Sequence, residues 1–361
     1  MPLIGFDAQA TQGRRSGLGV YTSNLLNALK KEIAEPFQLR VYAEKLAPEK
    51  NVNTLQRLGW ENWTLPGLVR RDKVDILHVP AFAPAFLKPC RLVVTVHDIA
   101  GRLFKNQIGR SSAFYWGTWL PFVVKQADRI IADSQHTQQD LLRHLKVREE
   151  KITVVYPSGH EGFTTGILKE TLATVKRNLN ICGNYFLFVG TLEPRKNLNR
   201  ILNAFKIFSV LHPDYQLVLV GSQKFGHGKY TEALEKEHDL GSSSVLATGF
   251  IDHETLNALY CGARGLLFPS LYEGFGIPIL EAMVSGCPVL TSNMTSTPEV
   301  AGNAAILVDP YSVEAIAQGM LDLVQNGFLQ NDLRQKGFEQ IRKFSWEKAA
   351  REVIDVYKEL L

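Results

Sequence analysis

The sequence predicts an α/β fold of two domains, each a parallel sheet flanked by helices. The chain has 361 residues, which suits two domains of roughly 150 residues each. Two series of short apolar runs alternate with longer amphipathic stretches, a pattern typical of buried parallel strands joined by helices. Hydrophobic residues make up 45% and charged residues 21% of the chain, which excludes a disordered or fibrous protein.

The first series predicts the sheet of an N-terminal domain, residues 1–160. Its runs are almost continuously apolar, as expected for strands that are buried on both faces. They span Leu3–Phe6, Leu39–Tyr42, Ile76–Val79, Leu92–Val96, Arg129–Ala132 and Ile152–Val155. After the fifth run, Ser134 precedes the helical stretch Thr137–Leu145, so an N-cap is its expected role, with ligand contact as the alternative.

The second series predicts a C-terminal domain, residues 181–344, after a linker at 161–180. A polar segment rich in Pro, Gly and Thr begins at Pro157 and suits a connection between domains. The strands are expected at Tyr185–Val189, Gln216–Val220, Val245–Thr248, Leu266–Phe268, Val289–Leu290 and Ala305–Val308. No internal sequence repeat relates the two domains.

Residues 345–361 predict a final helix. Ser345 suits an N-cap, and the segment Trp346–Tyr357 carries its apolar residues on one side. That side must be buried, and we expect it to pack back on the N-terminal domain, although the sequence itself does not choose between the domains.

Charge is divided unevenly along the chain. Residues 1–160 hold 22 Lys and Arg against 14 Asp and Glu, whereas the remainder holds 18 against 22. A basic half suits an anionic partner such as a membrane surface or a phosphorylated acceptor, and an uneven scatter of surface charges explains the numbers equally well. Nothing in the sequence favours nucleic acid as a partner.

Cysteine spacing and the first residues predict a cytoplasmic protein. The four cysteines form no close pair, which argues against a disulfide framework or a zinc knuckle. The segment at 1–10 has no basic region and no long apolar core, so it does not resemble a secretory signal. No apolar run approaches the ~18 residues that would span a bilayer.

Two predicted strand ends carry residues that suit a diphosphate. Arg195 and Lys196 follow the strand at 185–189, while Gly274 and Gly276 follow the strand at 266–268. In open α/β sheets ligands bind beyond the carboxyl ends of the strands. Glycine lets backbone N–H groups approach an anion, and the positive end of the helix Ile277–Ser285 attracts it. We therefore predict a diphosphate cradle at this edge.

Two carboxylates accompany this cradle. Glu273 lies in the loop and Glu281 lies about a turn and a half into the helix. Because carboxylates repel phosphate, they are expected to contact neutral, hydroxyl-rich parts of one ligand. A sugar and a ribose are the natural candidates.

The segment Glu273–Met283 resembles the E-x7-E signature of retaining glycosyltransferases of family 4. That family has the GT-B fold, in which two Rossmann-like α/β/α domains face each other across a cleft. Further similar segments extend the resemblance over nearly the whole chain: Ser16–Tyr21, Val96–Asp98, Ala132–Ser134 and Gly190–Asn197.

The resemblance implies roles for individual residues of the second domain. Glu273 would contact the transferred sugar near its reacting carbon, Glu281 would hold the ribose, and Arg195 and Lys196 would hold the diphosphate. Many members carry Gly-Arg where this chain has Gly190-Thr191, so Arg195 is expected to substitute for the missing cation. The full set of predicted donor-binding residues is Gly17, Gly19, Thr191, Arg195, Lys196, Phe250, Ile251, Gly274, Phe275, Gly276 and Glu281, with Phe250 and Ile251 beside the nucleobase.

In the first domain the resemblance places His97 near the donor sugar as a hydrogen-bonding group. Without that resemblance, a lone histidine is more often a structural hydrogen-bonding residue. The expected catalytic residues are thus Glu273, His97, Lys196 and Arg195. Asp98 is expected to orient its loop or meet the acceptor.

Gly17 and Gly19 precede a helix that is expected to begin near Val20. They form an incomplete dinucleotide fingerprint, and no strand leads directly into them. We interpret them as part of a loop that closes over the phosphate or the acceptor.

The segment 102–122 is basic and aromatic, with an aromatic stretch at 114–122 that includes Trp116, Trp119 and Phe122. Aromatic residues at helical spacing are usually core. The alternative is a contact with an acceptor or with the inner face of the membrane. Both interpretations stay open.

Together these features predict a retaining hexosyltransferase of polysaccharide or glycoconjugate biosynthesis. The expected donor is a nucleotide-diphosphate sugar, UDP-glucose first and GDP-mannose second, and the acceptor is a sugar or a lipid-linked glycan. No Asp-x-Asp pair occurs, so neither metal nor other cofactor is expected. A GT-B sugar epimerase or phosphorylase, an NAD oxidoreductase, which would need an intact glycine fingerprint, and a non-catalytic assembly protein are the alternatives.

Overall fold

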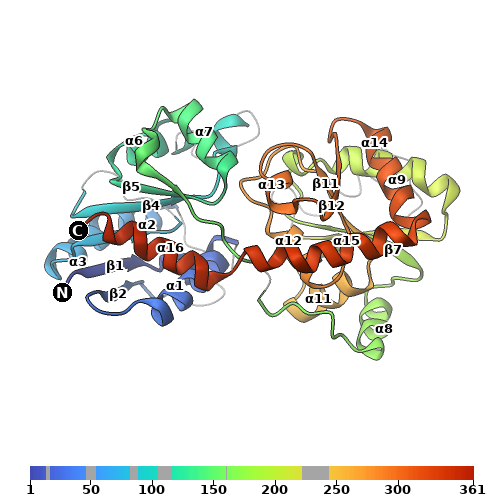
Figure 1. Ribbon diagram of the computed structural model, residues 1–361, viewed down its shortest axis with the longest axis horizontal. Helices are drawn as coiled ribbons and strands as arrows, with labels where there is room; N and C mark the ends of the chain where they lie inside the picture. Colours follow the sequence, from blue (N-terminus) through green and yellow to red (C-terminus); the bar gives the residue numbers. More distant parts are fainter. Residues whose placement is uncertain (14–16, 46–53, 82–87, 105–114, 160, 222–243) are drawn as a thin grey trace. The chain divides into compact units, whose positions relative to one another are not determined.

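The computed structural model divides the chain into two compact units (Figure 1). It describes residues 1–13, 17–45, 54–81, 88–104, 115–159, 161–221 and 244–361. The first unit combines residues 1–158 with 344–361, and the second contains residues 159–343. Each unit is built around one parallel sheet of six strands.

The sheet of the first unit has the strand order β2-β1-β3-β4-β5-β6. Its strands are β1 (Leu3–Asp7), β2 (Gln38–Tyr42), β3 (Ile76–Val79), β4 (Arg91–Val96), β5 (Arg129–Ala132) and β6 (Ile152–Val154). Its α-helices are α1 (Gly17–Glu32), α2 (Thr54–Gly59), α3 (Leu65–Arg71), α4 (Ala100–Leu103), α6 (Leu120–Gln126), α7 (Gln135–Leu145) and α16 (Trp346–Lys358). Short π-helical turns precede α3 and α6, at η2 (Trp60–Thr64) and η4 (Tyr115–Trp119).

The sheet of the second unit has the strand order β12-β11-β10-β7-β8-β9. Its strands are β7 (Asn184–Val189), β8 (Tyr215–Val220), β9 (Val245–Gly249), β10 (Gly265–Phe268), β11 (Val289–Ser292) and β12 (Ala305–Val308). Its helices are α8 (Lys169–Asn178), η6 (Pro194–Lys196), α9 (Leu198–Leu211), α11 (His253–Gly262), α12 (Ile277–Val284), α13 (Thr297–Ala301), α14 (Val313–Gln325) and α15 (Gly327–Gln340).

Each predicted strand coincides with an observed strand, with ends that differ by two residues at most. The agreement arises because the inner strands are buried on both faces and are therefore distinct apolar runs, as in β3, β8 and β10. The edge strands β2 and β12 are more exposed. The predicted N-caps are also confirmed: the Ser134 hydroxyl accepts a hydrogen bond from the Thr137 amide, and Ser345 accepts one from Lys348.

The segment expected as a linker, residues 161–180, contains helix α8. The sequence of this helix is polar, and none of its residues is fully buried. Its apolar pattern is therefore too weak to predict a helix. It packs on α11, where Leu172 lies against the backbone of Gly262.

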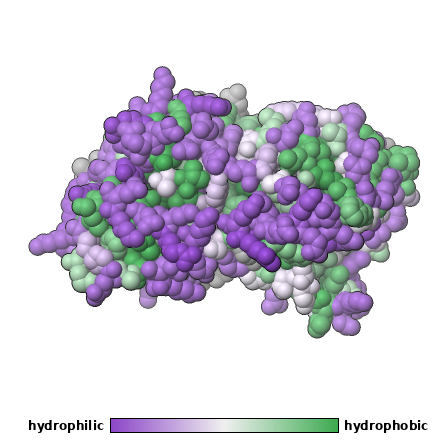
Figure 2. All heavy atoms as spheres, viewed as in Figure 1, coloured by the Kyte–Doolittle hydropathy of each residue, from purple (hydrophilic) through white to green (hydrophobic). Residues whose placement is uncertain are grey.

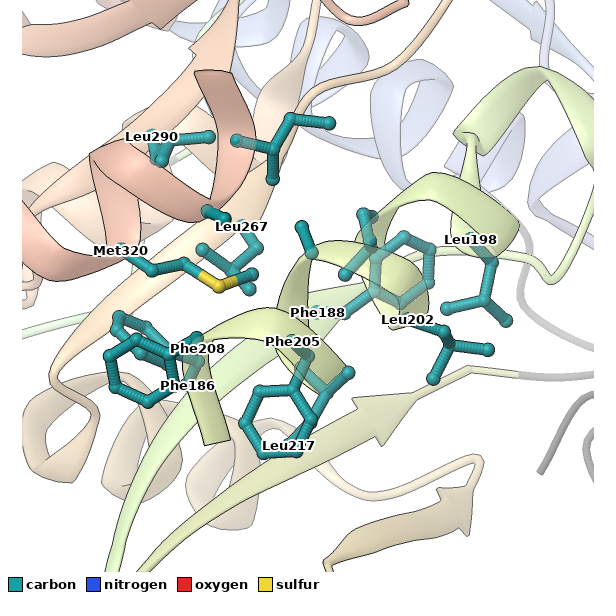
Figure 3. Packing of buried hydrophobic residues seen from close by; sticks show 14 of the residues in the cluster. Phe186, Phe188, Leu198, Leu202, Phe205, Phe208, Leu217, Leu267, Leu290 and Met320 are labelled. Carbon is teal, nitrogen blue, oxygen red and sulfur yellow. The ribbon is translucent and has the colours of Figure 1, made fainter. Parts of the chain in front are cut away.

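The core of the second unit is packed with aromatic rings from β7 and α9 (Figure 3). Phe186 and Phe188 come from β7, and Phe205 and Phe208 come from α9; all four are fully buried. The ring of Phe186 meets Phe208 edge to face, with centroids 5.3 Å apart. This packing fixes β7 and α9, and therefore the turn between them.

Helix α16 packs against α1 within the first unit. Its Trp346 ring meets Tyr21 of α1 at a centroid distance of 5.3 Å. At the other end, the Tyr357 hydroxyl lies 2.6 Å from Nδ1 of the buried His78 on β3. The end of the chain thus contributes to the core of the first unit.

Candidate active site

The candidate donor site lies where the strand order of the second sheet reverses. Strands β7 and β10 are neighbours there, although two other strands separate them in sequence. Such switch points open a crevice at the carboxyl ends of the strands, where ligands of doubly wound sheets bind. Arg195 and Lys196 follow β7, and Glu273 follows β10, so the topology explains why segments 77 residues apart meet.

Glycine occupies the carboxyl ends of three adjacent strands, at Gly190, Gly221 and Gly249. The Gly190 amide donates to the Val220 carbonyl, and the Gly221 amide donates to the Gly249 carbonyl. Gly221 has a φ of +144°, and a Cβ there would lie 2.0 Å from the Gly190 oxygen. Only glycine fits at this position. The edge beside Thr191, which is partly exposed, is therefore lined by backbone.

Two cations share the Glu273 carboxylate. Lys196 Nζ lies 2.5 Å from Glu273 Oε1, and Arg195 Nη1 lies 3.0 Å from Oε2. Arg195 Nε also contacts Glu193 at 3.0 Å, and its Nη1 donates to the Tyr272 carbonyl at 3.1 Å. The cluster thus balances two positive charges against two carboxylates.

The cluster is sheltered from water. Lys196 and Glu273 are 7% and 6% exposed, and the Lys196 ammonium lies 4.8 Å from the centre of the Phe268 ring. Burial by itself would raise the pKa of Glu273, but the charges of Lys196 and Arg195 outweigh burial and lower it. Glu273 is therefore ionised at neutral pH.

The loop that presents Glu273 is held by hydrogen bonds from the turn that follows strand β11. The Ser296 hydroxyl lies 3.0 Å from the Glu273 carbonyl and 2.9 Å from the Phe275 carbonyl. The Glu273 amide donates to Thr295 Oγ1 at 3.3 Å. Gly276 then begins α12 with a φ of +110°, which favours glycine. Gly274, Phe275 and Gly276 are all buried.

Glu281 lies on α12 and pairs with a tyrosine of α11. The buried Tyr260 hydroxyl donates to Glu281 Oε2 at 2.8 Å. Burial raises the pKa of Glu281 to about 7, against the opposing effect of this hydrogen bond. Near neutral pH the carboxyl group can therefore change its protonation state when a ligand binds.

The residues expected beside the nucleobase follow β9. Phe250 comes directly after Gly249 and is 72% exposed, while Ile251 is partly buried. An exposed aromatic ring at a strand end is suited to stacking on a flat ligand.

His97 follows β4 in the first unit, and both of its ring nitrogens have partners. Nδ1 lies 2.6 Å from Asp133 Oδ2, and Nε2 lies 2.7 Å from the Pro80 carbonyl oxygen. The adjacent Asp98 accepts a hydrogen bond from the Ala100 amide at 2.8 Å, so it orients the start of α4, one of the two roles expected for it.

The expected loop at Gly17 and Gly19 is helical instead. Helix α1 begins at Gly17, and Gly19 is buried in its first turn, so the expected helix start near Val20 was wrong. The Thr22 hydroxyl donates to the Leu18 carbonyl at 2.8 Å, as happens within a regular helix. Ser16 lies outside the described residues, and contact with the donor or acceptor stays a prediction for both glycines.

The aromatic segment at 114–122 is part core and part surface. Trp116 is half-buried and lies directly against Gly101, where a Cβ would be 2.2 Å from its Nε1. Trp119 is half-buried too, whereas Phe122 is 43% exposed. Phe114 and residues 105–113 lie outside the described residues, and membrane or acceptor contact stays a prediction.

Three residues that position the site have no clear signal in the sequence: Asp133, Tyr260 and Ser296. Asp133 lies within the segment Ala132–Ser134, but no pattern links it to His97, 36 residues away. Tyr260 lies on one face of an ordinary amphipathic helix. For Ser296, the following Thr-Pro-Glu marks a helix start, but nothing indicates that it clamps another loop.

Neither a metal centre nor a membrane-spanning helix is found among the described residues. There, no group of three or more His, Cys, Asp or Glu side chains is placed to hold a metal ion. In the same part of the chain, no helix combines the length and apolarity needed to cross a bilayer. On the face in Figure 2, hydrophilic residues cover much of each unit, interrupted by smaller apolar areas.

Comparison with known proteins covers both units. Residues 174–340 match the family described as glycosyl transferases group 1, and residues 15–158 match glycosyltransferase family 4. The O-antigen chain mannosyltransferase B of Escherichia coli is 30% identical over 80% of this chain and 75% of its own length. The serotype-specific mannosyltransferase WbdA of the same species is 29% identical over 77% of this chain, but over only 34% of its own length.

Among solved structures, Anabaena Alr3699/HepE in complex with UDP-glucose matches with a TM-score of 0.75. The match covers 99% of this chain and 100% of that chain at 15% identity, and so shows the fold alone. The two six-stranded parallel sheets are those of the GT-B glycosyltransferases, as predicted. The family matches, the fold and the relative at 30% identity agree that the chain is a glycosyltransferase and belongs to glycosyltransferase family 4.

Proposed function

We propose that this enzyme transfers a mannosyl residue from a nucleotide-diphosphate donor to a glycan or lipid-linked glycan, with retention of configuration and without a metal ion. The observation that carries the proposal is the buried cluster of Arg195, Lys196 and Glu273 at the switch point of the second sheet. It joins two phosphate-binding cations to a carboxylate that suits sugar hydroxyls.

Donor binding is an exchange of partners in this proposal. Before the donor binds, Glu273 forms ion pairs with both Lys196 and Arg195. The diphosphate then takes over Lys196 and Arg195, and the released carboxylate of Glu273 accepts hydrogen bonds from the sugar hydroxyls. The amides at the start of α12 supply further donors to the phosphates. These cations and the helix dipole take the place of a divalent metal.

The nucleoside is held by α12 and the end of β9. Glu281 accepts hydrogen bonds from the ribose hydroxyls through the oxygen that does not contact Tyr260. Phe250, with its exposed ring, lies beside the base.

The role given to Glu273 also favours a front-face transfer. A carboxylate that accepts hydrogen bonds from the sugar hydroxyls is a weaker nucleophile than a free one. The bond from the sugar carbon to the phosphate oxygen then breaks as the bond to the acceptor oxygen forms on the same face. The departing phosphate oxygen takes the acceptor proton. Lys196 and Arg195 stabilise the charge that develops on this leaving group.

We propose GDP-mannose ahead of UDP-glucose as the donor. Both Escherichia coli proteins are named mannosyltransferases, and one of them is 30% identical to this chain. This reverses the order expected from the sequence. The O-antigen chain named for the first relative favours a glycan acceptor.

We further propose that a lipid-linked acceptor is met at the inner face of the membrane, through exposed apolar residues such as Leu103 and Phe122. Co-sedimentation with anionic vesicles tests this contact. Binding that is unchanged in the variant Phe122→Ser with Leu103→Ser would contradict it.

Titration calorimetry in excess chelator tests the donor site. We expect GDP to bind and UDP and ADP to bind at least tenfold more weakly, a difference of about 1.4 kcal/mol. GDP-mannose offered with mannose-terminated glycans should then give an α-linked product, since the donor is α-linked. Stronger binding of UDP would restore UDP-glucose, and an inverted product would exclude the front-face path.

A further inference from the structure

Both ring nitrogens of His97 lie against hydrogen-bond acceptors. Asp133 Oδ2 lies 2.6 Å from Nδ1, and the Pro80 carbonyl oxygen lies 2.7 Å from Nε2. A carbonyl only accepts hydrogen bonds, and so does an ionised carboxylate. A neutral imidazole has one N–H, so it satisfies only one of these partners. The doubly protonated ring satisfies both.

We propose that Asp133 is a positioning residue that holds His97 as an imidazolium, so that His97 supplies a fixed positive charge to the transfer reaction. This inference rests on the proposed function, because it concerns the same reaction. His97 then has no ring nitrogen available as a base. This agrees with the proposed transfer of the acceptor proton to the departing phosphate oxygen.

The buried carboxylate makes this pairing strong. Asp133 is 4% exposed, and the His97 side chain is 19% exposed. Burial disfavours the charged ring, but the charge and hydrogen bond of Asp133, the Pro80 carbonyl and the charge of Asp98 outweigh it and raise the pKa of His97. A raised pKa extends the charged state of His97 to higher pH, and the charge is lost as the pH rises through that pKa.

The other titratable groups around His97 are neutral. Tyr21 of α1 packs edge-on against the ring at a centroid distance of 4.5 Å, and burial raises its pKa well above 10. His78 of β3 contacts Tyr357 and Thr95. Burial and the charge of His97 lower the pKa of His78 to about 3. Asp133 and Asp98 are therefore the charged partners of His97 among the described residues.

Nuclear magnetic resonance of the full chain, produced without a histidine tag and labelled in its nine histidines, tests the protonation state directly. The variant His97→Gln identifies the His97 signals. We expect two protonated ring nitrogens at pH 7.5 in the wild type. In Asp133→Asn the pKa of His97 should fall by roughly 1–3 units, the loss of one opposite charge. A neutral ring in the wild type at pH 7.5 would overturn the proposal, even if Asp133→Asn fails to fold.

Activity assays then test the catalytic consequence. In Asp133→Asn, kcat should fall by roughly tenfold or more, with the donor KM little changed, and the loss of activity at high pH should move to lower pH. Asp140→Asn is the matched control, because Asp140 contacts His136 at 3.4 Å on α7 of the same unit. A high-pH limb that stays in place would overturn the proposal. Failure to transfer mannose at all would refute the proposed function, while the resonance result would still decide the state of His97.

Discussion

The carboxyl edges of the two sheets differ in composition: the second sheet combines a glycine-lined part with the cluster of Arg195, Lys196 and Glu273, whereas the first sheet carries ionisable side chains at several strand ends. In the second unit, glycines end or follow β7, β8 and β9, so backbone lines the edge. In the first unit, β1 ends in Asp7, and His97 and Asp133 follow β4 and β5. The glycines in the second unit leave room for an anion to approach backbone amides. In the first unit, ionisable side chains stand at the strand ends.

The charges at the two edges also differ in how they are held. Asp133 and a backbone carbonyl fix His97 from both sides, and Asp7 is fixed by the Trp60 indole at 3.0 Å. In the second unit, by contrast, the cations are paired with the Glu273 carboxylate, which a diphosphate would replace in the proposed mechanism. Under that proposal, the edge of the second sheet exchanges its charge partners, whereas the edge of the first sheet keeps them.

Removing a cation from the exchanging edge should have the largest effect. Lys196→Ala is expected to lower kcat/KM by roughly 100-fold or more, because charge on the leaving diphosphate loses a buried partner. Initial-rate assays with the proposed donor, GDP-mannose, measure this loss. Arg200→Ala is the matched control, since Arg200 lies over the Tyr311 ring outside the cluster. Equal losses in both variants would contradict a specific role for Lys196.

A side chain added at the glycine-lined edge of the second sheet should lower the stability of the protein. Gly221→Ala brings a Cβ to 2.0 Å from the Gly190 oxygen and should cost about 2–4 kcal/mol in the free energy of unfolding. Gly249→Ala meets no atom within 4 Å, so only its positive φ should cost about 1 kcal/mol. Denaturant unfolding of both variants measures the difference. Similar costs would show that the close approach of β7 and β8 does not require glycine.

Titration of Glu281 should have a smaller effect, on the pH dependence of donor affinity. The pKa of Glu281 is raised to about 7, and ribose hydroxyls donate to its ionised form. Donor affinity should therefore fall by up to about tenfold between pH 8 and pH 6. Calorimetry with the nucleotide sugar measures it, because a phosphodiester does not titrate there. Glu281→Gln should bind more weakly and show no such dependence; a dependence that persists would assign the titration to another group.

The sequence predicts the carboxyl edge of the second sheet better than that of the first sheet. The strands of both sheets are distinct apolar runs, and the candidate residues of the proposed donor site lie in local segments, Gly190–Asn197 and Glu273–Glu281. Their meeting follows from the switch point between β7 and β10. The local motifs therefore predicted which residues meet at this edge, and the diphosphate expected there stays a prediction.

Long-range polar pairs could not be predicted in the same way. The contacts of Asp133 with His97 and of Tyr260 with Glu281 join different elements, and no periodicity relates such partners. The start of α1 at Gly17 was also missed, because two glycines in a first turn look like a loop. Helix α8 was missed because its exposed, polar surface gives no apolar stripe.

The most direct test of the exchange at the donor site is the affinity of Glu273→Gln for GDP, measured by calorimetry in chelator beside the wild type and Lys196→Ala. If the diphosphate replaces Glu273 as the ion-pair partner of Lys196 and Arg195, Glu273→Gln should bind GDP as tightly as the wild type or more tightly. The same variant should lose transfer activity. Lys196→Ala should bind at least tenfold more weakly, about 1.4 kcal/mol. Weaker binding by Glu273→Gln, or wild-type affinity in Lys196→Ala, would contradict the account.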